Sequence, residues 1–535
     1  MPEPFAVVSV EQMRALEAAA IEAGTPERVL QERAGLAVAD VVEEELAARG
    51  DRAGGSPRIA VLVGSGNNGR DAVVAGRRLA ARGCQVNLWH GARSPLSRQE
   101  TLDVRAEGIR IRQFDGGGWA APLVASHEGA DIAIDGLLGV GSRGPMRPDL
   151  AAVASAVNEA RSTVPTLRVV AVDVPSGIDA DDGSTPGQVV PADVTVTFGA
   201  VKAGLLRFPA ASYVGRLVPK PIGLSAGSAD RFPVHVLDEA LVAPLVPARP
   251  LDAHKYKFGR VLVVAGSDRF VGAACLGSEA AARAGAGLVG VVSTEAVKRV
   301  LATRLPEATY PLTLAGSDDD PEGAADRVAG LLPEQAVVLI GPGIDRAEPT
   351  DRFLRRFLAH NGQPGRHVDA VVDADALSLL AGWERWWEKI GKGNVLTPHA
   401  GEMSRLVASD PDLGEVEGEA PWETARRAAA RWRQVIVLKG PFTTVAEPGG
   451  RAWIWPHANP ALATAGTGDV LAGLITGLLS QSMLPLDAAR LGVVVHAVAG
   501  RRLVERRGAR TLVASDLPPA LPAVLSALAA QDRPC

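Results

Sequence analysis

Short runs of apolar residues, many of them β-branched, recur along the chain and alternate with longer segments rich in Ala, Leu and Arg. The clearest runs in the first half are IAVLV from Ile59, DIAIDG from Asp131 and LRVVAVDVPSG from Leu167. Strands that are apolar at every position are buried on both faces, as in parallel sheets covered by helices. We therefore predict an α/β fold built on doubly wound, parallel sheets.

A second series of such runs begins at RVLVVAGS, from Arg260, and continues to QVIVLKG, which ends at Gly440. Between about residues 219 and 250 the alternation lapses, and Pro, Gly and Ser accumulate. A chain of 535 residues also exceeds what one hydrophobic core usually organises. We therefore predict two α/β domains, at residues 1–225 and 240–535, with the boundary in this segment.

Three further elements are predicted from local patterns. The segment from Val10 to Ala48 reads as an amphipathic helical region. TTVAEPGGRAWIWP reads as a β-hairpin that turns at Gly449-Gly450, and a long apolar helix is expected from Asp469.

Composition and charge favour small-molecule chemistry. The net charge is -5 with acids and bases interspersed, which offers no basic surface to nucleic acid or to an anionic membrane. The three cysteines, Cys84, Cys275 and Cys535, are too scattered for a disulfide framework or a zinc site. No signal peptide is recognisable, and the longest apolar helix candidate, around residues 470–479, is half the ~20 residues that a membrane span needs. We expect a soluble, cytoplasmic homo-oligomer without nucleic-acid or membrane partners.

A glycine-rich turn follows the first of these strands. The run Gly64-Ser65-Gly66-Asn67-Asn68-Gly69 has the spacing G-x-G-x-x-G, and a helix from Asp71 would direct its amides at the turn. A dehydrogenase would carry an acidic residue at the end of the next strand to bind a ribose, but that strand reads QVNLWHG. Asparagine amides suit a monovalent cation or a polar ring better than a bare phosphate. The turn therefore predicts recognition beyond phosphate and disfavours redox chemistry.

Polar groups also follow the next two strands. Asp135 ends DIAIDG, and Asp173 and Ser176 lie in VDVPSG. The carboxyl ends of neighbouring parallel strands converge on one crevice, so we expect these groups to meet the glycine-rich turn. Each aspartate alone could instead cap a turn or a helix. Three polar, glycine-containing loops at three strand ends together predict a binding site.

Four motifs over most of residues 10–225 resemble those of the NAD(P)H-hydrate epimerases of the YjeF N-terminal type: AAAIEAGTPERVLQERAG, GSGNNGRD, DGLLGVGSRGP and AVDVPSGIDADDG. The resemblance implies a Rossmann-like α/β/α domain in which Asn68, Asp135 and Ser176 hold a potassium ion and Asp173 faces the reacting centre. It also implies a set of contacts to the hydrated nicotinamide nucleotide, formed by Asn67, Asn68, Gly69, Arg70, Asp71, Gly139, Val140, Gly141, Ser142, Arg143, Gly144, Pro145 and Asp173.

The glycine-rich turn departs from the usual GNNGGDG of that family. Arg70 and Ala72 stand where the family has glycines. Arg70 could pair with a phosphate or could obstruct the close approach of a ligand to the backbone.

A second candidate site lies in ATAGTGDVLAGLITGLL. Gly466, Thr467 and Gly468 come just before Asp469, and flexible glycines at a helix N-terminus let several N–H groups face one anion. A carboxylate beside an anion site is suited to accept a proton, so Asp469 is a candidate general base for a hydroxyl that attacks a phosphoryl group. Alternatively, Asp469 caps the helix. The chain has no G-x-x-x-x-G-K-[ST] P-loop, so another architecture must hold any nucleotide.

Seven ordered motifs span about residues 250–515: HKYKFGRVLVVAGS, VGAACLGSEAAARAGAGLV, GPGI, DADAL, LTPHAGEM, VLKGPFT and AGTGD. They resemble the ribokinase-like superfamily and, more closely, its ADP/ATP-dependent NAD(P)H-hydrate dehydratases of the YjeF C-terminal type. The resemblance implies that the hydrated dinucleotide is contacted by Ala273, Gly343, His399 and Asp469. It implies that the adenine nucleotide is bound by Lys439, Gly440, Pro441, Phe442, Thr443 and Gly468. From the residues alone, His399 could be a core histidine and Lys439 a solvated charge.

Together the two resemblances imply a multifunctional enzyme, isomerase and lyase, that repairs nicotinamide nucleotides. It would interconvert R- and S-NAD(P)HX and dehydrate the S epimer to NAD(P)H at the expense of ADP, with ATP as the other possible donor. The implied ions are potassium in the first domain and Mg²⁺ in the second. One alternative makes the second domain a kinase for a vitamin precursor or sugar, and the first domain a non-catalytic ligand-binding module.

Overall fold

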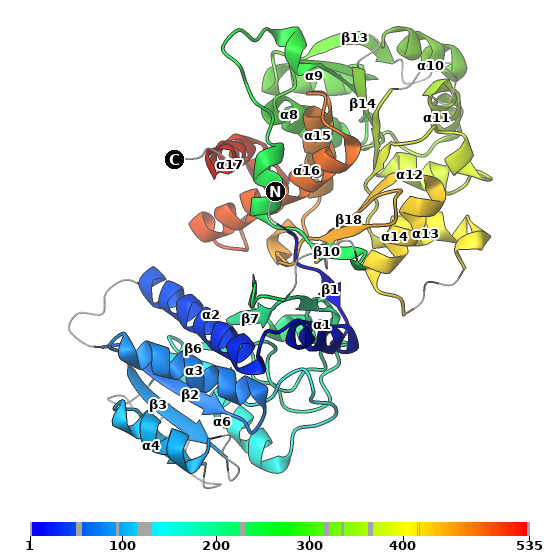
Figure 1. The fold of residues 1–535 in the computed structure, drawn as a ribbon. Coiled ribbons are helices and arrows are strands. Elements are labelled where there is room, and N and C mark those ends of the chain that lie inside the picture. The colour runs from blue at the N-terminus through cyan, green and yellow to red at the C-terminus, as the bar shows by residue number, and fades with distance from the viewer. Residues whose placement is uncertain are drawn as a thin grey trace. The chain divides into compact units, whose positions relative to one another are not determined.

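The computed structural model of the protein describes residues 3–49, 56–91, 96–114, 130–224, 231–314, 320–332, 336–361, 368–414, 416 and 418–531. Phe5–Phe232 form one compact unit, and the chain from Pro233 onward forms another (Figure 1). The strand β10, at Val234–Val236, pairs within the second sheet, so the second unit begins before residue 240. Cys535 lies outside the described residues.

The first unit is an α/β/α sandwich. Its seven-stranded, fully parallel sheet has the order β4-β3-β2-β5-β6-β7-β9. The strands of this sheet are β2 (Arg58–Val63), β3 (Gln85–His90), β4 (Arg110–Gln113), β5 (Ile132–Gly136), β6 (Arg168–Val172), β7 (Val194–Phe198) and β9 (Arg216–Lys220). The helices are α1 (Val10–Glu22), α2 (Glu27–Ala48), α3 (Asn67–Ala81), α4 (Arg98–Ala106) and α6 (Pro148–Thr163). A separate parallel pair joins β1 (Val7–Val8) to β8 (Val201–Lys202).

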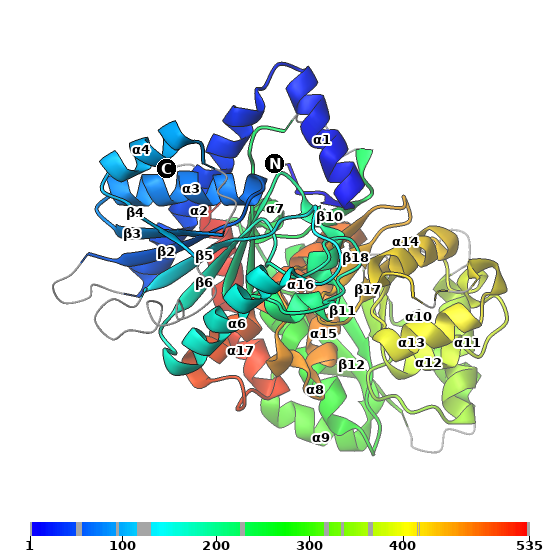
Figure 2. The ribbon, with the colours of Figure 1, turned by 90° about the horizontal axis from the view of Figure 1, so that it is seen from below.

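Alternate residues of each central strand enter different hydrophobic cores. In β2, Ile59, Val61 and Val63 belong to the core that contains α2 and α3, whereas Ala60 and Leu62 belong to the core that contains α6. Figure 2 shows α3 and α6 on opposite faces of this sheet. Burial on both faces explains the continuous apolar runs, and the predicted doubly wound fold is confirmed.

The second unit is built on a ten-stranded sheet in the order β10-β19-β18-β17-β16-β15-β14-β11-β12-β13, parallel except where β18 runs antiparallel to β17 and β19. Its further strands are β11 (Arg260–Val264), β12 (Leu288–Thr294), β13 (Thr309–Leu314), β14 (Ala336–Ile340), β15 (Ala370–Val372), β16 (Val395–Leu396), β17 (Val435–Leu438), β18 (Thr444–Ala446) and β19 (Ala452–Ile454). Its helices are α7 (Glu239–Val242), α8 (Val271–Ala284), α9 (Glu295–Arg304), α10 (Pro321–Gly330), α11 (Glu348–Asn361), α12 (Asp375–Leu380), α13 (Ala400–Ala408), α14 (Pro421–Trp432), α15 (Thr467–Leu479), α16 (Pro485–Arg507) and α17 (Leu517–Gln531). The hairpin β18–β19 confirms the prediction from TTVAEPGGRAWIWP.

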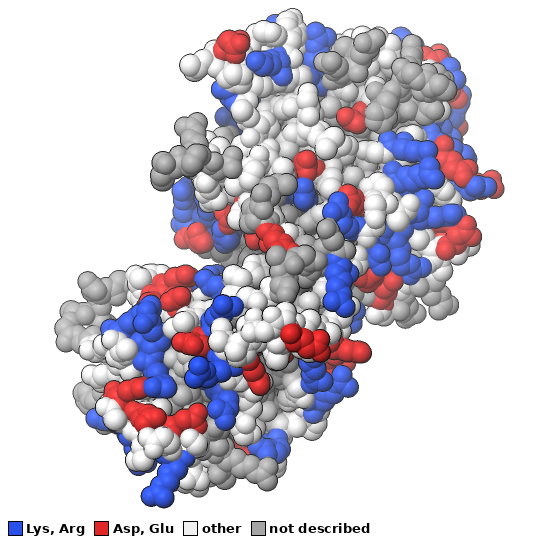
Figure 3. Space-filling model, viewed as in Figure 1, with Lys and Arg blue, Asp and Glu red and all other residues white. Residues whose placement is uncertain are grey.

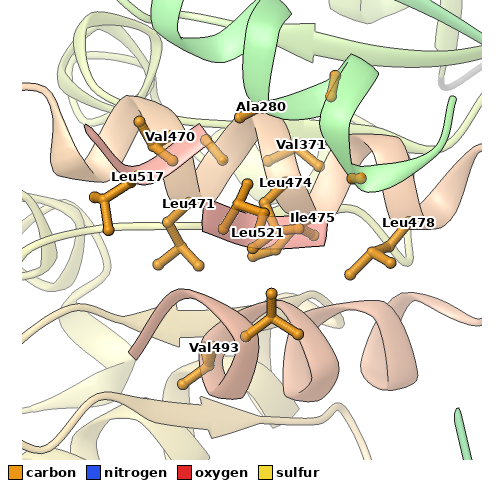
Figure 4. Packing of buried hydrophobic residues seen from close by; sticks show 14 of the residues in the cluster. Ala280, Val371, Val470, Leu471, Leu474, Ile475, Leu478, Val493, Leu517 and Leu521 are labelled. Atoms are coloured by element: carbon orange, nitrogen blue, oxygen red, sulfur yellow. The ribbon is translucent and has the colours of Figure 1, made fainter. Parts of the chain in front are cut away.

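The apolar helix α15 lies inside the core of this unit. Figure 4 shows its side chains among residues of α8, α16 and α17, including Ala280, Val470, Leu471, Leu474, Ile475, Leu478, Val493, Leu517 and Leu521. Its backbone approaches α8 closely, because an added Cβ at Gly473 would lie 2.1 Å from the carbonyl oxygen of Gly277. Glycine at this position therefore allows α15 and α8 to touch.

Three predicted helix boundaries differ from those observed. The N-terminal helical region is two helices, α1 and α2, because Gly24 has a φ of 100° and Pro26 is the N-cap of α2. The helix expected from Asp71 begins at Asn67, and the one expected from Asp469 begins at Thr467. In both later cases a glycine is the N-cap, so the helix starts directly after it.

No helix among the described residues is both long and apolar enough to cross a bilayer. On the face shown in Figure 3, Lys and Arg side chains are interspersed with Asp and Glu over both units.

Each sheet reverses its direction of winding once. In the first unit the chain proceeds outward from β2 to β3 and β4, and then from β5 to β6 and β7 on the other side. In the second unit the corresponding point lies between β11 and β14. The loops that leave the carboxyl ends of these strands diverge there, and open α/β sheets bind ligands at such points.

Candidate active sites

The glycine-rich turn of the first unit joins β2 to α3 at the point of reversal. The Gly64 amide donates to the Gly136 carbonyl at 3.0 Å. An added Cβ at Gly64 would lie 1.9 Å from the carbonyl oxygen of Leu137, and one at Gly69 would lie 2.1 Å from that of Gly64. The turn therefore needs glycine to approach the loop after β5, and this approach brings Asn68 over the strand ends.

Two of the three residues expected to hold potassium, Asn68 and Ser176, bond the backbone of Leu138, and the third, Asp135, bonds Ser176. Asn68 Nδ2 donates to Leu138 O at 3.2 Å and to Val172 O at 2.5 Å. Ser176 Oγ accepts from Leu138 N at 2.9 Å and donates to Asp135 Oδ1 at 2.7 Å. Asp135 is fully buried, and burial raises its pKa to about 6 although the bonds from Ser176 oppose that rise. A cation placed here would stabilise this carboxylate, which has no ion-pair partner within the described ranges.

Asp173 is a buried carboxylate held at the end of β6. Its φ is 65°, a conformation that strains a residue with a side chain. Its Oδ1 accepts from Thr197 Oγ1 and Phe198 N, each at 3.1 Å, and pairs with Lys202 Nζ at 2.5 Å. The second oxygen, Oδ2, receives no hydrogen bond from any described residue. Asp173 is therefore fixed through one oxygen and leaves the other available.

Asp71 lies in α3, and its buried Oδ1 lacks a hydrogen-bond partner in the part of the chain that is described. Burial raises the pKa of Asp71 to about 8, and the charges of Asp173, Glu17 and Glu27 add to the effect. Asp71 is thus protonated at neutral pH. The neighbouring carboxylate of Asp173 is paired with the ammonium group of Lys202.

The segment from Gly139 to Pro145 lies beside these groups. An added Cβ at Gly139 would lie 2.3 Å from Asn68 Oδ1, so this loop passes directly against the asparagine. Val140 and Ser142 are half-buried, and the exposed members are Gly141, Arg143, Gly144 and Pro145. This exposed, glycine-containing loop lies next to the polar side chain of Asn68, where a ligand could bind.

Arg70 and Ala72, which replace glycines of the family motif, do not direct their side chains into the glycine-rich turn. Arg70 is directed to α4, where NH1 lies 3.5 Å from Glu100 Oε1 in an exposed ion pair. Ala72 is fully buried in the core that contains α2 and α3. Asn67 Nδ2 donates to Glu27 Oε1 at 3.3 Å, which ties the turn to α2.

The second site lies between the loops that follow β11 and β14. The Gly266 amide donates to Pro342 O at 2.8 Å and joins these loops. Gly343 has a φ of 62°, and an added Cβ there would lie 3.0 Å from Ala273 Cβ and 2.7 Å from Phe270 Cβ. Ala273 and Gly343, both predicted substrate contacts, are therefore neighbours, with the exposed ring of Phe270 beside them.

Lys439 and Asp373 form an ion pair at the ends of β17 and β15. Nζ lies 2.7 Å from Asp373 Oδ1, and Asp373 is 1% exposed. Burial opposes the charge of Lys439, but the carboxyls of Asp373, Glu402 and Asp469 outweigh it and raise the pKa of Lys439. Lys439 is therefore a fixed cation among carboxyl groups and not a solvated charge.

Asp469 lies in the first turn of α15, but it is not the helix cap. The N-cap is Gly466, with a φ of 90°. Burial raises the pKa of Asp469 to about 7, with Asp373 adding to the rise and Lys439 opposing it. A carboxyl with this pKa exchanges a proton readily at neutral pH, as general-base catalysis requires.

The glycine and threonine that precede Asp469 are held in place from two sides. An added Cβ at Gly468 would lie 3.1 Å from Lys439 Nζ, so the backbone passes directly over the ammonium group. His496 Nε2 lies 3.0 Å from Thr467 O, and burial lowers the pKa of His496 to about 4. A neutral imidazole therefore donates to this carbonyl and secures the start of α15.

His399 is an exposed helix cap and not a core histidine. Its Nδ1 accepts from the amides of Gly401 at 3.0 Å and Glu402 at 3.3 Å, while the Glu402 carboxylate accepts from the His399 amide at 2.9 Å. Burial and the neighbouring cations Lys439 and Arg405 lower the pKa of His399, so its ring is neutral at pH 7.

The predicted nucleotide-binding segment is the loop between β17 and β18. It begins at Lys439, whose amide donates to Pro398 O at 2.8 Å, and it ends at Thr443, whose hydroxyl donates to Gly440 O at 3.1 Å. Gly440 and Pro441 are exposed, and Phe442 is half-buried. No atom lies within 4 Å of an added Cβ at Gly440, so the loop has open space above it.

Comparisons with known proteins match the two parts of the chain to two families. Residues 27–204 match the family described as YjeF-related protein N-terminus, and residues 261–522 match the family described as NAD(P)H-hydrate dehydratase. The bifunctional NAD(P)H-hydrate repair enzyme Nnr of Moorella thermoacetica is 37% identical over 537 residues, which cover 97% of this chain and 96% of that protein. The chain belongs to the bifunctional NAD(P)H-hydrate repair enzyme family.

Other members of the family are similarly related. The enzyme of Coxiella burnetii is 34% identical over 95% of this chain and 97% of its own, and that of Escherichia coli is 34% identical over 85% and 83%. Among solved structures, the ADP/ATP-dependent NAD(P)H-hydrate dehydratase from Bacillus subtilis, co-crystallised with ATP/Mg²⁺, is 32% identical. It aligns with a TM-score of 0.46 and covers 54% of this chain and 97% of that one.

Four polar residues of this repair-enzyme chain were not singled out from the sequence. Lys202 and Thr197 surround Asp173, and Asp373 and Glu402 surround Lys439. Asp373 and Glu402 lie inside the quoted motifs DADAL and LTPHAGEM, so their carboxyls were a usable signal. Lys202 stands alone in the apolar segment FGAVKAGLL, where a buried charge is unusual.

Proposed function

We propose that the chain performs two successive steps in the repair of hydrated nicotinamide nucleotides. The first unit interconverts the R and S epimers of NAD(P)HX, with Asp173 at the reacting centre. The second unit dehydrates the S epimer to NAD(P)H at the expense of ADP, giving AMP and phosphate, with ATP as an alternative donor. Epimerisation lets a stereospecific dehydratase consume both forms of the damaged cofactor.

The observation that carries the proposal is the placement of Asp469. It sits in the first turn of α15, beside the Lys439–Asp373 pair, with a pKa raised to about 7. Hydroxide is a poor leaving group at neutral pH, and a phosphate ester is a far better one. Asp469 would take the proton of the ring hydroxyl as that oxygen attacks the donor phosphoryl group.

The surrounding groups would stabilise the transferred phosphoryl group and then its departure. The amides of Gly466 and Gly468 lie at the positive end of α15 and would donate to the transferred group, whereas the Thr467 amide already donates to Thr464 O at 3.3 Å. Lys439 supplies a fixed positive charge. The lone pair of the ring nitrogen then expels phosphate, and loss of a proton from the adjacent ring carbon restores the dihydronicotinamide ring. Ala273, Gly343 and His399 would contact the dinucleotide, and the loop from Lys439 to Thr443 would hold the adenine nucleotide.

Mg²⁺ would enter the second site together with the nucleotide. The described residues contain no group of three or more His, Cys, Asp or Glu side chains arranged to hold a metal. Mg²⁺ is commonly held by one or two carboxylates and the substrate's phosphates. The unpartnered Oδ2 of Asp373 and the carboxyl of Glu402 fit that need, and these two residues would hold the ion. When bound, Mg²⁺ neutralises phosphate charge.

Potassium would occupy the first site beside Asn68, Asp135 and Ser176. Amide, carboxylate and hydroxyl oxygens suit a hard monovalent cation, and the buried Asp135 carboxyl lacks a counter-charge among the described residues. The positive charge of the potassium ion would hold the loops after β5 and β6 in place.

We also propose a cytoplasmic location and a homo-oligomeric state. Cys84 and Cys275 are free thiols in the described chain, which supports a reducing compartment. Size-exclusion chromatography with light scattering measures the oligomeric state.

The experiment that tests the second step supplies purified protein with the S epimer of hydrated NADH, Mg²⁺ and either ADP or ATP. Nicotinamide absorbance and phosphate are followed together. The proposal predicts one phosphate for each NADH formed, and AMP when ADP is the donor. A stable phosphorylated product without NADH would identify a small-molecule kinase instead.

A further inference from the structure

Lys202 is a fully buried lysine in the first unit, on the short strand β8. Its ammonium group lies 2.5 Å from Asp173 Oδ1, 3.2 Å from Thr197 Oγ1 and 3.1 Å from Phe198 O. An ammonium group has three protons, and three acceptors surround this one. Burying a charge without partners costs a large free energy. A fully buried lysine whose three protons all have acceptors therefore indicates a specific binding arrangement for its ammonium group.

The same arrangement leaves one oxygen of Asp173 unused. Lys202, Thr197 and Phe198 N all engage Oδ1, and no described residue donates to Oδ2. The backbone of Asp173 is held at a φ of 65°, and its amide donates to Val196 O at 2.8 Å. The ion pair and the strained backbone together fix the direction in which Oδ2 points.

Two other carboxyls interact with this pair, Glu17 on α1 and Asp71 on α3. Glu27 on α2 interacts in turn with both of them. Burial raises the pKa of Glu17, and Lys202 opposes that rise more strongly than Arg14 does. Asp71, whose Oδ1 is buried without a partner, has its pKa raised to about 8. The ammonium of Lys202 therefore lies against one carboxyl of a crowded acidic site.

We propose that Lys202 is a positioning residue of the epimerase site: its ammonium group holds Asp173 through Oδ1 and keeps Oδ2 directed at the substrate. Asp173 then acts as the proton acceptor through Oδ2. This inference rests on the proposed epimerase function. It concerns how one buried carboxylate is oriented, not which substrate is bound.

The test replaces the ammonium group and measures kcat and KM of epimerisation. Lys202→Met removes the hydrogen bonds that the ammonium group donates and retains most of the side-chain volume. Without the bond to Oδ1, Oδ2 of Asp173 is no longer held toward the substrate. We therefore expect kcat to fall by ~10-fold or more, with a smaller change in KM. Thr197→Val is the matched control: it removes one hydroxyl from the same cluster, keeps the ammonium group, and should lower kcat less than Lys202→Met.

Three controls make every result decisive. Dehydration of the S epimer by the second unit should be unchanged in each variant. If circular dichroism shows that Lys202→Met does not fold, Lys202→Gln, which is neutral and smaller, must lower kcat more than Thr197→Val does, with KM nearly unchanged. An unchanged kcat, or a fall in kcat no larger than that of Thr197→Val, would overturn the role of Lys202. Absence of epimerisation in the unmodified protein would instead refute the proposed function.

Discussion

Replacing Asp469 with Asn should abolish most dehydration while it makes the second unit more stable. The substitution keeps the size of the side chain and removes the proton acceptor. No hydrogen bond to the Asp469 carboxyl is found among the described residues, so the amide loses no partner. Removing a general base typically costs ~10²- to 10⁴-fold in rate, and we expect a loss of that size in kcat. Epimerisation in the first unit should be unaffected.

The gain in stability follows from the charge that folding places in the site. Folding raises the pKa of Asp469 from its ordinary value of 3.8 to about 7, chiefly by burial. The ionised carboxylate is therefore a cost that is absent below about pH 4, grows as the pH rises to 7, and is constant above it. The difference corresponds to at most ~4 kcal/mol, and partial exposure reduces it to the order of 1–3 kcal/mol. Asn avoids this cost, so the melting temperature of the second unit should rise by roughly 2–8 °C at pH 8.

Two assays on one preparation decide the matter. Calorimetry of both proteins should show the difference in melting temperature at pH 8 and its disappearance near pH 4. Unmodified dehydratase should lose activity as Asp469 is protonated, with about half of the carboxyl ionised at pH 7 and about one tenth at pH 6. Near-normal turnover in Asp469→Asn, or a loss of stability at pH 8, would refute the reasoning.

Three further substitutions test separate parts of the account. Gly468→Ala places a methyl group 3.1 Å from Lys439 Nζ, whose flexible end can move, so the protein should fold but bind ADP ~10-fold more weakly; an unchanged Kd in calorimetric titration would contradict this. Asp135→Ala removes the buried acceptor of the Ser176 hydroxyl and amide, and should abolish the dependence of epimerisation on potassium; a potassium titration that matches the unmodified protein would exclude the ion site. Trp386→Ala removes a fully buried side chain that packs against Trp432 at 4.8 Å between ring centroids, and should cost ~3–5 kcal/mol in urea denaturation of the second unit.

The fold could be predicted from the sequence because the residues of each strand indicate whether one or both of its faces are buried. Runs such as IAVLV are buried on both faces, and that requirement specifies helices on each side of a parallel sheet. The hairpin β18–β19 was equally accessible, since Gly449-Gly450 supplies the turn. Helix starts were less accessible. Asn67 and Thr467 each follow a glycine N-cap, and a pattern of apolar residues does not mark that position.

The sequence places the candidate sites on particular loops but does not reveal all the side chains around them. The loops at strand ends were visible as glycine-rich motifs, and the sheet topology brings them together. The partners that set their charges come from distant segments: Lys202 reaches Asp173 across 29 residues, and Lys439 reaches Asp373 across 66. The local pattern can single out Lys202 or Asp373, but it does not show which residue each one pairs with. His399 could also be interpreted as a core residue from the sequence, because its exposure depends on where α13 begins.

The central claim is that one chain carries two independent sites for consecutive steps, and a time course with a mixture of both NADHX epimers tests it most directly. Without nucleotide, purified protein should bring R and S epimers to equilibrium faster than the uncatalysed exchange and form no NADH. After ADP or ATP and Mg²⁺ are added, both epimers should disappear and be recovered as NADH. Conversion that stops when the S epimer is exhausted, or NADH formed without a nucleotide, would contradict the account.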